Sequence, residues 1–302
     1  MGDPLSQIVG LLHPRAVFAN VIAGKGQWAV RFAEYGRPSF CIVLDGGCRL
    51  SVDGHPPVAI EAGDFILLPT TPAFTLSSGE AARPVLLDPA DLPRDGSEVR
   101  YGEAGGAPDM RSLGGAFVFD DADPALLVSL LPGLVHVRGS ARLSRLVAMV
   151  AEETVGALPG SSAVLSRLAE LLLIEAMRAT SSGDAPPGLL RGLGDERLAV
   201  ALQLMHAQLD RPWTVPQLAR AAALSRSSFF ERFSRTVGVA PMEYLLGWRM
   251  QIARNLLRRG ELSAAQIADC VGYGSASAFS VAFRRHVGMA PGRYALATRV
   301  PD

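Results

Sequence analysis

The sequence predicts a two-part α+β protein, with a small antiparallel β-barrel or sandwich followed by an all-helical domain. Short β-type runs separated by turn residues fill the region from about Arg15 to Asp120, whereas residues 195–299 have no strand pattern. Between the two parts, residues 180–194 read TSSGDAPPGLLRGLG, which is rich in Ser, Gly and Pro and lacks apolar periodicity. We expect a barrel over 1–122, a helical dimerisation or cover region over 123–180, a linker over 181–194 and a helical domain over 195–302.

The predicted strands alternate with turn signals. They are Gln27–Phe32, Ser39–Leu44, Cys48–Val52, Asp64–Leu68 and Ala116–Phe119, and Asp45-Gly46 and Asp53-Gly54 are dipeptides typical of hairpins. A two-residue turn at Asp45-Gly46 would place Cys41 and Cys48 on one face, diagonal to each other. Diagonal Cα atoms lie about 7–8 Å apart, which is too far for a relaxed disulfide.

The pattern becomes helical from Pro124 to Ala179. Leucines 165, 168 and 172 fall at three- and four-residue steps, as do apolar residues between Leu143 and Val150. This leucine face either covers the barrel or pairs two subunits, and we favour pairing into a homodimer.

Composition excludes several classes of protein. The chain of 302 residues is 49% hydrophobic and 19% charged, as expected for ordinary globular domains. The first twelve residues contain Asp3 and no basic run, unlike a signal peptide, and charged residues interrupt the most apolar stretch, Val164–Ala179, so we expect no membrane span. The three cysteines do not form a disulfide framework, which favours a reducing, cytoplasmic location.

The net charge of zero hides a difference between the two ends. Residues 195–302 carry 14 basic and 8 acidic side chains, a net charge of +6, and the rest of the chain carries −6. This split suits a polyanion-binding domain fused to another domain, although an ordinary solvated surface also fits it.

The helical domain contains an internal repeat. At an offset of 50, the first copy (Phe229, Phe233, Arg235, Val237, Gly238, Ala240-Pro241 and Tyr244) matches the second (Phe279, Phe283, Arg285, Val287, Gly288, Ala290-Pro291 and Tyr294). Upstream the offset is 49, so the second copy has one extra residue in a turn. An internal repeat of this kind indicates that the domain contains two copies of one structural unit.

Each copy has the signature of a helix-turn-helix unit. Thr214 and Ser263 begin S/T-x-x-Q capping boxes, apolar residues follow at helical spacing, and Ser225 and Ser275 are N-caps for a second helix. We place the units at 214–237 and 263–287. A helix over Pro241–Arg259 joins them and spans about 27 Å, close to the roughly 34 Å between successive major-groove faces.

The stretch from Leu198 to Thr298 resembles the AraC/XylS class of bacterial regulators. It includes WTVPQLARAAALSRSSFFERFSRTVGVAPMEYLLGWRMQIARNLL, then IADCVGYGSASAFSVAFRRHVGMAPGRY. The resemblance implies a transcription regulator, activator or repressor, whose second helices enter the major groove of double-stranded DNA, with RNA polymerase as a further partner. Residues 1–194 resemble the cupin-type N-terminal half of some such regulators at 3–6, 40–52, 62–64, 68–69 and 130–137.

The outward faces of the two second helices supply the DNA-contact candidates. Candidates for base contact are Arg226, Ser227, Phe230, Glu231, Ser275, Ser277, Ser280 and Val281; candidates for phosphate contact are Arg232, Arg235, Arg249, Arg254, Arg284 and Arg285. The second set of base-contact residues has little hydrogen-bonding power, so we expect the first unit to discriminate bases more strongly. Phe230 has two interpretations, contact with thymine methyl groups or packing on a neighbouring helix.

The N-terminal half is predicted to hold a small-molecule pocket rather than a metal or other cofactor. Its histidines, His13, His55 and His136, lie far apart and form no H-x-H pair, so we expect no enzyme. The pocket candidates are Trp28, Phe40, Cys41, Cys48 and Phe74.

Three alternatives stay open at this point. The first alternative is an enzyme with a DNA-binding tail. The second is a redox or electrophile sensor that acts through Cys41 and Cys48, and the third is a constitutive DNA binder without an effector. The similar regulators often carry histidine where this chain has Cys41, which puts any inherited ligand chemistry in doubt. Both cysteines also suit plain core packing.

Overall fold

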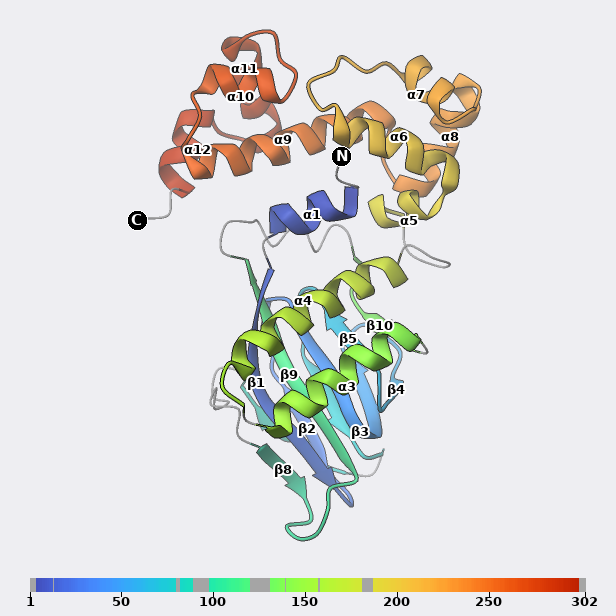
Figure 1. Cartoon of the computed structure of the whole chain (residues 1–302), viewed down its shortest axis with the longest axis vertical. Helices are drawn as coiled ribbons and strands as arrows, with labels where there is room; N and C mark the ends of the chain where they lie inside the picture. Colours follow the sequence, from blue (N-terminus) through green and yellow to red (C-terminus); the bar gives the residue numbers. More distant parts are fainter. Residues whose placement is uncertain are drawn as a thin grey trace. The chain divides into compact units, whose positions relative to one another are not determined.

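The computed structural model describes residues 4–12, 14–79, 82–88, 98–119, 131–138, 140–156, 158–180 and 187–298 (Figure 1). It divides into two compact units. The barrel unit begins at Pro14 and ends at Thr180, and the helical unit joins the N-terminal helix to the residues from 187 onward. The predicted barrel began at residue 1, whereas residues 4–12 belong to the helical unit.

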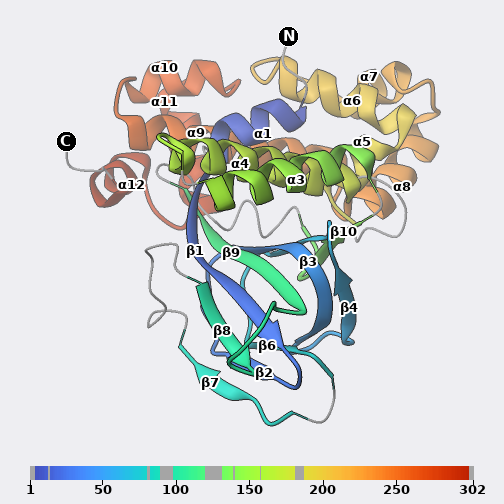
Figure 2. The ribbon, with the colours of Figure 1, turned by 60° about the horizontal axis from the view of Figure 1, so that its bottom comes forward.

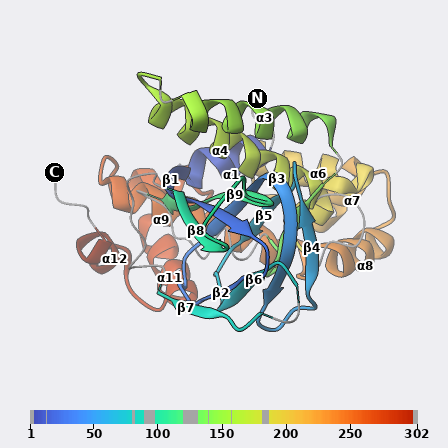
Figure 3. The same ribbon diagram turned by 90° about the horizontal axis from the view of Figure 1, so that it is seen from below.

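The barrel unit is built on one curled sheet (Figures 2 and 3). Its strands are β1 (Pro14–Lys25), β2 (Ala29–Phe32), β3 (Ser39–Val52), β4 (Val58–Glu61), β5 (Phe65–Leu68), β6 (Phe74–Ser77), β7 (Val85–Leu87), β8 (Glu98–Gly102), β9 (Met110–Phe119) and β10 (Val135–Val137). The order is β7-β2-β6-β3-β9-β1-β8, with β4 and β5 also pairing with β3 and β10 pairing with β5.

The predicted hairpin at Asp45-Gly46 is wrong. The strand β3 continues through this dipeptide, which pairs with Arg111 and Met110 of β9 across a bulge. Gly46 has φ 63°, and a Cβ there would lie 1.8 Å from the Asp109 carbonyl oxygen, so only glycine fits. Beyond the bulge β3 turns to pair with β4 and β6. The turn predicted at Asp53-Gly54 does join β3 to β4.

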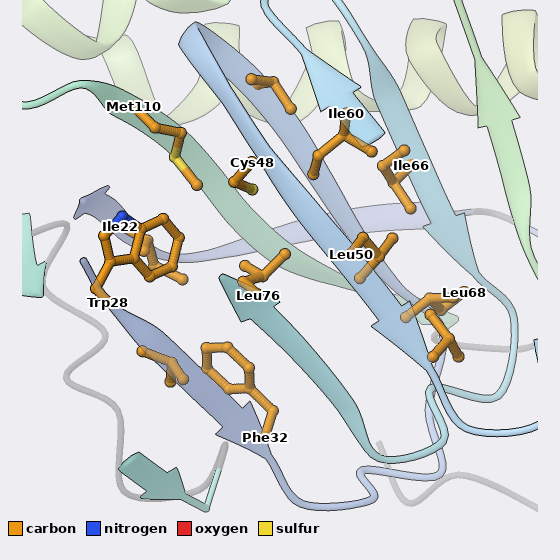
Figure 4. Packing of buried hydrophobic residues seen from close by; sticks show 13 residues of the cluster. Ile22, Trp28, Phe32, Cys48, Leu50, Ile60, Ile66, Leu68, Leu76 and Met110 are labelled. Carbon is orange, nitrogen blue, oxygen red and sulfur yellow. The ribbon is translucent and has the colours of Figure 1, made fainter. Parts of the chain in front are cut away.

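Apolar side chains of the curled sheet converge in one cluster (Figure 4). Its labelled members are Ile22, Trp28, Phe32, Cys48, Leu50, Ile60, Ile66, Leu68, Leu76 and Met110. Cys48 lies among the aliphatic side chains in this view, and it is 8% exposed. Burial of this apolar surface is the main favourable contribution to the stability of the unit.

Two helices lie against the sheet, α3 (Ala141–Gly156) and α4 (Ser161–Ala179). The predicted leucine face of α4, with Leu168 and Leu172, is buried inside the unit. Leu168 and Leu172 therefore cover the barrel, whereas Leu165 of the same face is half-buried. The region predicted as helical from residue 124 also contains β10, because Val135 and Val137 alternate with His136 and pair with the free edge of β5; residues 124–130 lie outside the described part.

The helical unit contains the predicted repeat together with additional helices. They are α1 (Pro4–Leu12), α5 (Leu189–Gly194), α6 (Glu196–Ala207), α7 (Val215–Ala221), α8 (Arg226–Val237), α9 (Pro241–Arg259), α10 (Ala264–Cys270), α11 (Ala276–Val287) and α12 (Pro291–Thr298). Part of the predicted linker is thus helical, since Leu189 and Leu190 of α5 are buried; residues 181–186 lie outside the described part. The long α9 connects the helix pair α7 and α8 to the helix pair α10 and α11 (Figure 1).

The two turns within the repeat differ at one backbone position. The turn after α7 places Ala223 at φ 51°, and the turn after α10 places Gly272 at φ 75°. An alanine in this left-handed region is strained, whereas glycine adopts it freely. The second turn holds the extra residue that the sequence offset predicts.

We expect opposite effects from exchanging these residues. Ala223→Gly relieves the backbone strain and raises the free energy of unfolding by about 0.5–1 kcal/mol. Gly272→Ala lowers the free energy of unfolding by more than about 1 kcal/mol, because the added Cβ would lie 2.6 Å from both the Asp210 carbonyl oxygen and the Arg249 guanidinium. Urea unfolding monitored by circular dichroism measures both values, and destabilisation by Ala223→Gly would contradict the assignment of strain.

Candidate DNA interface and effector cavity

The second helix of each repeat begins as the sequence predicts. The Ser225 Oγ accepts a hydrogen bond from the Ser228 amide, and the Ser275 Oγ accepts one from the Ala278 amide. The helices α8 and α11 each end at a glycine with φ 88°. Both helices are therefore fixed at their two ends by local contacts.

Aromatic rings hold the two units in the same way. Phe229 packs against Phe233 with a centroid distance of 5.5 Å, and Phe233 meets Tyr244 of α9 edge to face at 5.8 Å. In the second copy Phe279 packs against Phe283 at 5.5 Å, and Phe283 meets Tyr294 of α12 edge to face at 5.5 Å. All four phenylalanines are fully buried. This ring ladder, as we call these six residues, leaves the opposite faces of α8 and α11 to solvent.

The predicted base-contact residues lie on those open faces. Arg226, Ser227 and Glu231 of α8 are exposed, as are Ser275 and Ser277 at the start of α11, and Ser280 is half-buried. Two apolar side chains are also exposed, Phe230 by 46% and Val281 by 70%. The exposure of Phe230 argues against the interpretation that it packs on a neighbouring helix.

The six predicted phosphate contacts divide into two groups. Arg235, Arg284 and Arg285 are exposed on their helices. Arg232 instead donates to the Asp195 carboxylate at 2.6 Å and so fixes the N-cap of α6.

Two further arginines of this set have partners inside the helical unit. Arg249 donates to the carbonyl oxygens of Leu209 and Arg211, and burial lowers its pKa. Arg254 lies over the Tyr294 ring. Arg232, Arg249 and Arg254 therefore have partners within the helical unit, and phosphate contact by these three arginines stays a prediction.

The N-terminal helix α1 packs against α6 of the helical unit, a contact that sequence reasoning missed. Ile8 and Leu12 are fully buried. The Gln7 amide oxygen lies 3.2 Å from Nδ1 of His206, and the Tyr244 hydroxyl lies 2.6 Å from Nε2. A neutral His206 satisfies both contacts, donating from Nδ1 to Gln7 and accepting at Nε2 from Tyr244.

His206 is held in this neutral form by burial. It is 5% exposed and its ring stacks on Trp248 at 4.2 Å. Burial lowers its pKa to about 3, because the imidazolium would lose its hydration. Burial likewise raises the pKa of Tyr244 well above its ordinary value.

The barrel unit contains a cavity of about 300 Å³. Its lining combines apolar and aromatic side chains with a few polar ones: Val17, Phe18, Asn20, Ile22, Phe32, Tyr35, Arg37, Ser39, Phe40, Cys41, Thr71, Phe74, Leu76, Gly114, Gly115, Ala116 and Val118. This volume lies at the lower end of the roughly 300–1,000 Å³ typical of small-molecule sites. Phe40, Cys41 and Phe74 line the cavity as predicted, whereas Trp28 and Cys48 belong to the core cluster.

Neither cysteine of the barrel has the character of a reactive thiol. Burial raises the pKa of Cys41 to about 11, opposed by a hydrogen bond with Ser112. Burial also raises the pKa of Cys48, and the nearby Cys41 adds to this effect. Since the thiolate is the reactive form, the redox and electrophile alternative is not favoured.

A buried carboxylate of the same unit, Asp64, lies outside the cavity lining. The Asp64 Oδ2 is 2.7 Å from Nε2 of His136 and 3.4 Å from the Arg138 guanidinium, and it accepts from the Glu61 amide. These contacts join the turn before β5 to β10, so we assign the cluster a structural role. Over the described ranges, no group of three or more His, Cys, Asp or Glu residues could hold a metal ion, and no described helix is long and apolar enough to cross a membrane.

Comparison with known proteins agrees with both units. Residues 3–182 match a family described as "Cupin", and residues 218–297 match one described as "Helix-turn-helix domain". A "Putative AraC-like transcription regulator" of Streptomyces lividans is 38% identical, over 97% of each chain. The "HTH-type transcriptional regulator AlkR" of Acinetobacter baylyi is 29% identical, over 97% of this chain and 98% of its own.

Solved structures include the DNA-binding domain of the transcriptional factor AdpA in complex with a target DNA. It is 31% identical and covers 34% of this chain and 93% of its own, with a TM-score of 0.33. The two domain matches and the full-length relatives identify this chain as a member of the AraC-like transcription regulators, with a cupin-type N-terminal domain and a DNA-binding helix-turn-helix domain.

Proposed function

We propose that α8 and α11 enter successive major grooves on one side of the duplex, with α9 as the rigid spacer. The exposed Phe230 and Val281 are the observation that carries this proposal, since both apolar side chains lie on the open faces of α8 and α11. Apolar side chains on a groove-facing helix contact thymine methyl groups. Arg235, Arg284 and Arg285 supply phosphate contacts around them.

The first unit discriminates bases more strongly than the second in this proposal. Its open face combines Arg226, which has the fork geometry for a guanine edge, with Glu231, an acceptor for cytosine N4. The corresponding face of α11 offers serine hydroxyls and Val281, which hydrogen-bond weakly or not at all.

We expect Arg226→Ala to weaken specific DNA binding by about 10- to 100-fold, the value of one good base-edge contact. Selection of binding sites from random DNA supplies the operator, and fluorescence anisotropy measures the affinity of the variant. Arg167→Ala, an exposed arginine of α4, is the matched control. Equal sequence information in the two half-elements would contradict the assignment to the first unit.

The cavity of the barrel unit binds a small-molecule effector in the same proposal. Its apolar lining supports a binding role rather than catalysis, as do the names of the relatives. We propose a cytoplasmic regulator that binds double-stranded DNA and contacts RNA polymerase. Homodimer formation also stays a prediction, which sedimentation of the full chain tests.

A further inference from the structure

We propose that the effector is a small apolar carboxylate, with its hydrocarbon body in the cavity and its anionic group at Arg37. This inference rests on the proposed effector site of the barrel unit. Of the described cavity-lining residues, Arg37 carries the one formal charge. A cation beside a largely apolar cavity favours an anion attached to an apolar body, because transfer of the apolar body from water into the cavity is favourable.

The segment that carries Arg37 is fixed by the backbone around Thr71. The amides of Tyr35 and Gly36 donate to the Thr71 carbonyl oxygen at 3.1 and 3.4 Å. The Thr71 hydroxyl lies within hydrogen-bond distance of the Arg37 carbonyl oxygen and 2.7 Å from Ser39 Oγ. These contacts hold the Arg37 backbone in place before any ligand arrives, which reduces the entropic cost of binding.

The guanidinium itself remains open to a ligand. Arg37 is exposed and lies over the Tyr35 ring, with 5.9 Å between its Cζ and the ring centroid. Stacking on an aromatic ring leaves the edge of a guanidinium, with its N–H donors, free for a carboxylate. The described residues give Arg37 no carboxylate partner of its own.

Two adjacent glycines of β9 explain how the body of the ligand is accommodated. A Cβ on Gly115 would lie 2.4 Å from the Phe40 ring, so packing alone accounts for that glycine. A Cβ on its neighbour Gly114 would meet no atom within 4 Å, although Gly114 lines the cavity. Glycine within a strand weakens the strand and often marks the close approach of a ligand. We infer that Gly114 leaves space for the body of the ligand.

Titration calorimetry on the full chain tests both parts of the inference. The probes are decanoate and 2-naphthoate, compared with the neutral decanamide and 2-naphthamide and with the cationic decylamine. We expect each carboxylate to bind about two- to fivefold more tightly than its amide, as for a partly exposed ion pair. Arg37→Gln should remove this advantage, whereas Arg83→Gln, an exposed arginine outside the lining, should retain it.

A second pair of variants separates the ligand class from the site. Gly114→Phe should fill the cavity and weaken every probe, whereas Gly79→Phe, at a position with equally open space outside the lining, should not. If carboxylate and amide bind equally and Gly114→Phe weakens both, the carboxylate inference fails and the effector cavity stands. If neither carboxylate binds, the inference is overturned. If binding is unaffected by Gly114→Phe, the proposed cavity fails as well.

Discussion

Phe233→Ala and Phe283→Ala are each expected to destabilise the helical unit by about 3–5 kcal/mol. Both rings are fully buried in the ring ladder. Removal of either ring leaves a cavity and ends an edge-to-face contact with Tyr244 or Tyr294. The second helix of that unit then loses its fixed position, so we expect protection of the corresponding half of the operator to disappear first. Urea unfolding and footprinting measure the two effects.

Phe230→Ala is the matched control for Phe233→Ala, because it removes the same kind of side chain from the same helix at an exposed position. We expect its free energy of unfolding to change by less than about 0.5 kcal/mol, while its affinity for DNA falls. If Phe233→Ala and Phe230→Ala lowered stability equally, the ring ladder would not be the core of the repeat.

The repeat could be predicted from the sequence because its determinants are local. The N-caps, the apolar spacing and the glycines at 238 and 288 all act within a turn or two of their own helix. The same contacts reappear in both copies, so each copy tests the interpretation of the other. The bounds of α9, Pro241–Arg259, are those predicted, since proline begins the helix and Gly260 follows its last residue.

The errors arise where distant segments decide the local structure. Asp45-Gly46 is a hairpin dipeptide by local preference, but its neighbours in β9 continue the ladder and convert the expected turn into a bulge. The strand β10 forms because β5 offers it a free edge. The cavity lining comes from β1, β2, β3, β6 and β9 and from the segments that precede β3 and β6, so the sequence pattern could not identify Arg37 or Gly114 as part of it.

The contact between the N-terminal helix α1 and α6 is the clearest one that the sequence does not predict. Gln7 and His206 are 199 residues apart, and neither belongs to a recognisable motif. The buried Ile8 and Leu12 make α1 part of the core of the helical unit rather than of the barrel. The feature that explains this arrangement is the buried His206. Both nitrogens of a buried neutral imidazole need hydrogen-bond partners, and Gln7 of α1 supplies the second one beside Tyr244.

Acidification is therefore expected to destabilise the helical unit through His206. Its pKa in the folded protein, about 3, lies below the unfolded value of 6.5, so the unfolded chain takes up the proton first as the pH falls. The stabilisation is fully present above pH 6.5 and is lost progressively below it, by about 2 kcal/mol at pH 5. This loss depends on the unfolded pKa, because at pH 5 the folded protein is still almost entirely unprotonated at His206. His206→Gln should flatten the pH dependence of urea unfolding between pH 7.5 and 5 even if it lowers stability throughout. His286→Gln, at an exposed position, is the matched control, and an unchanged slope in His206→Gln would show that the proton uptake belongs to another group.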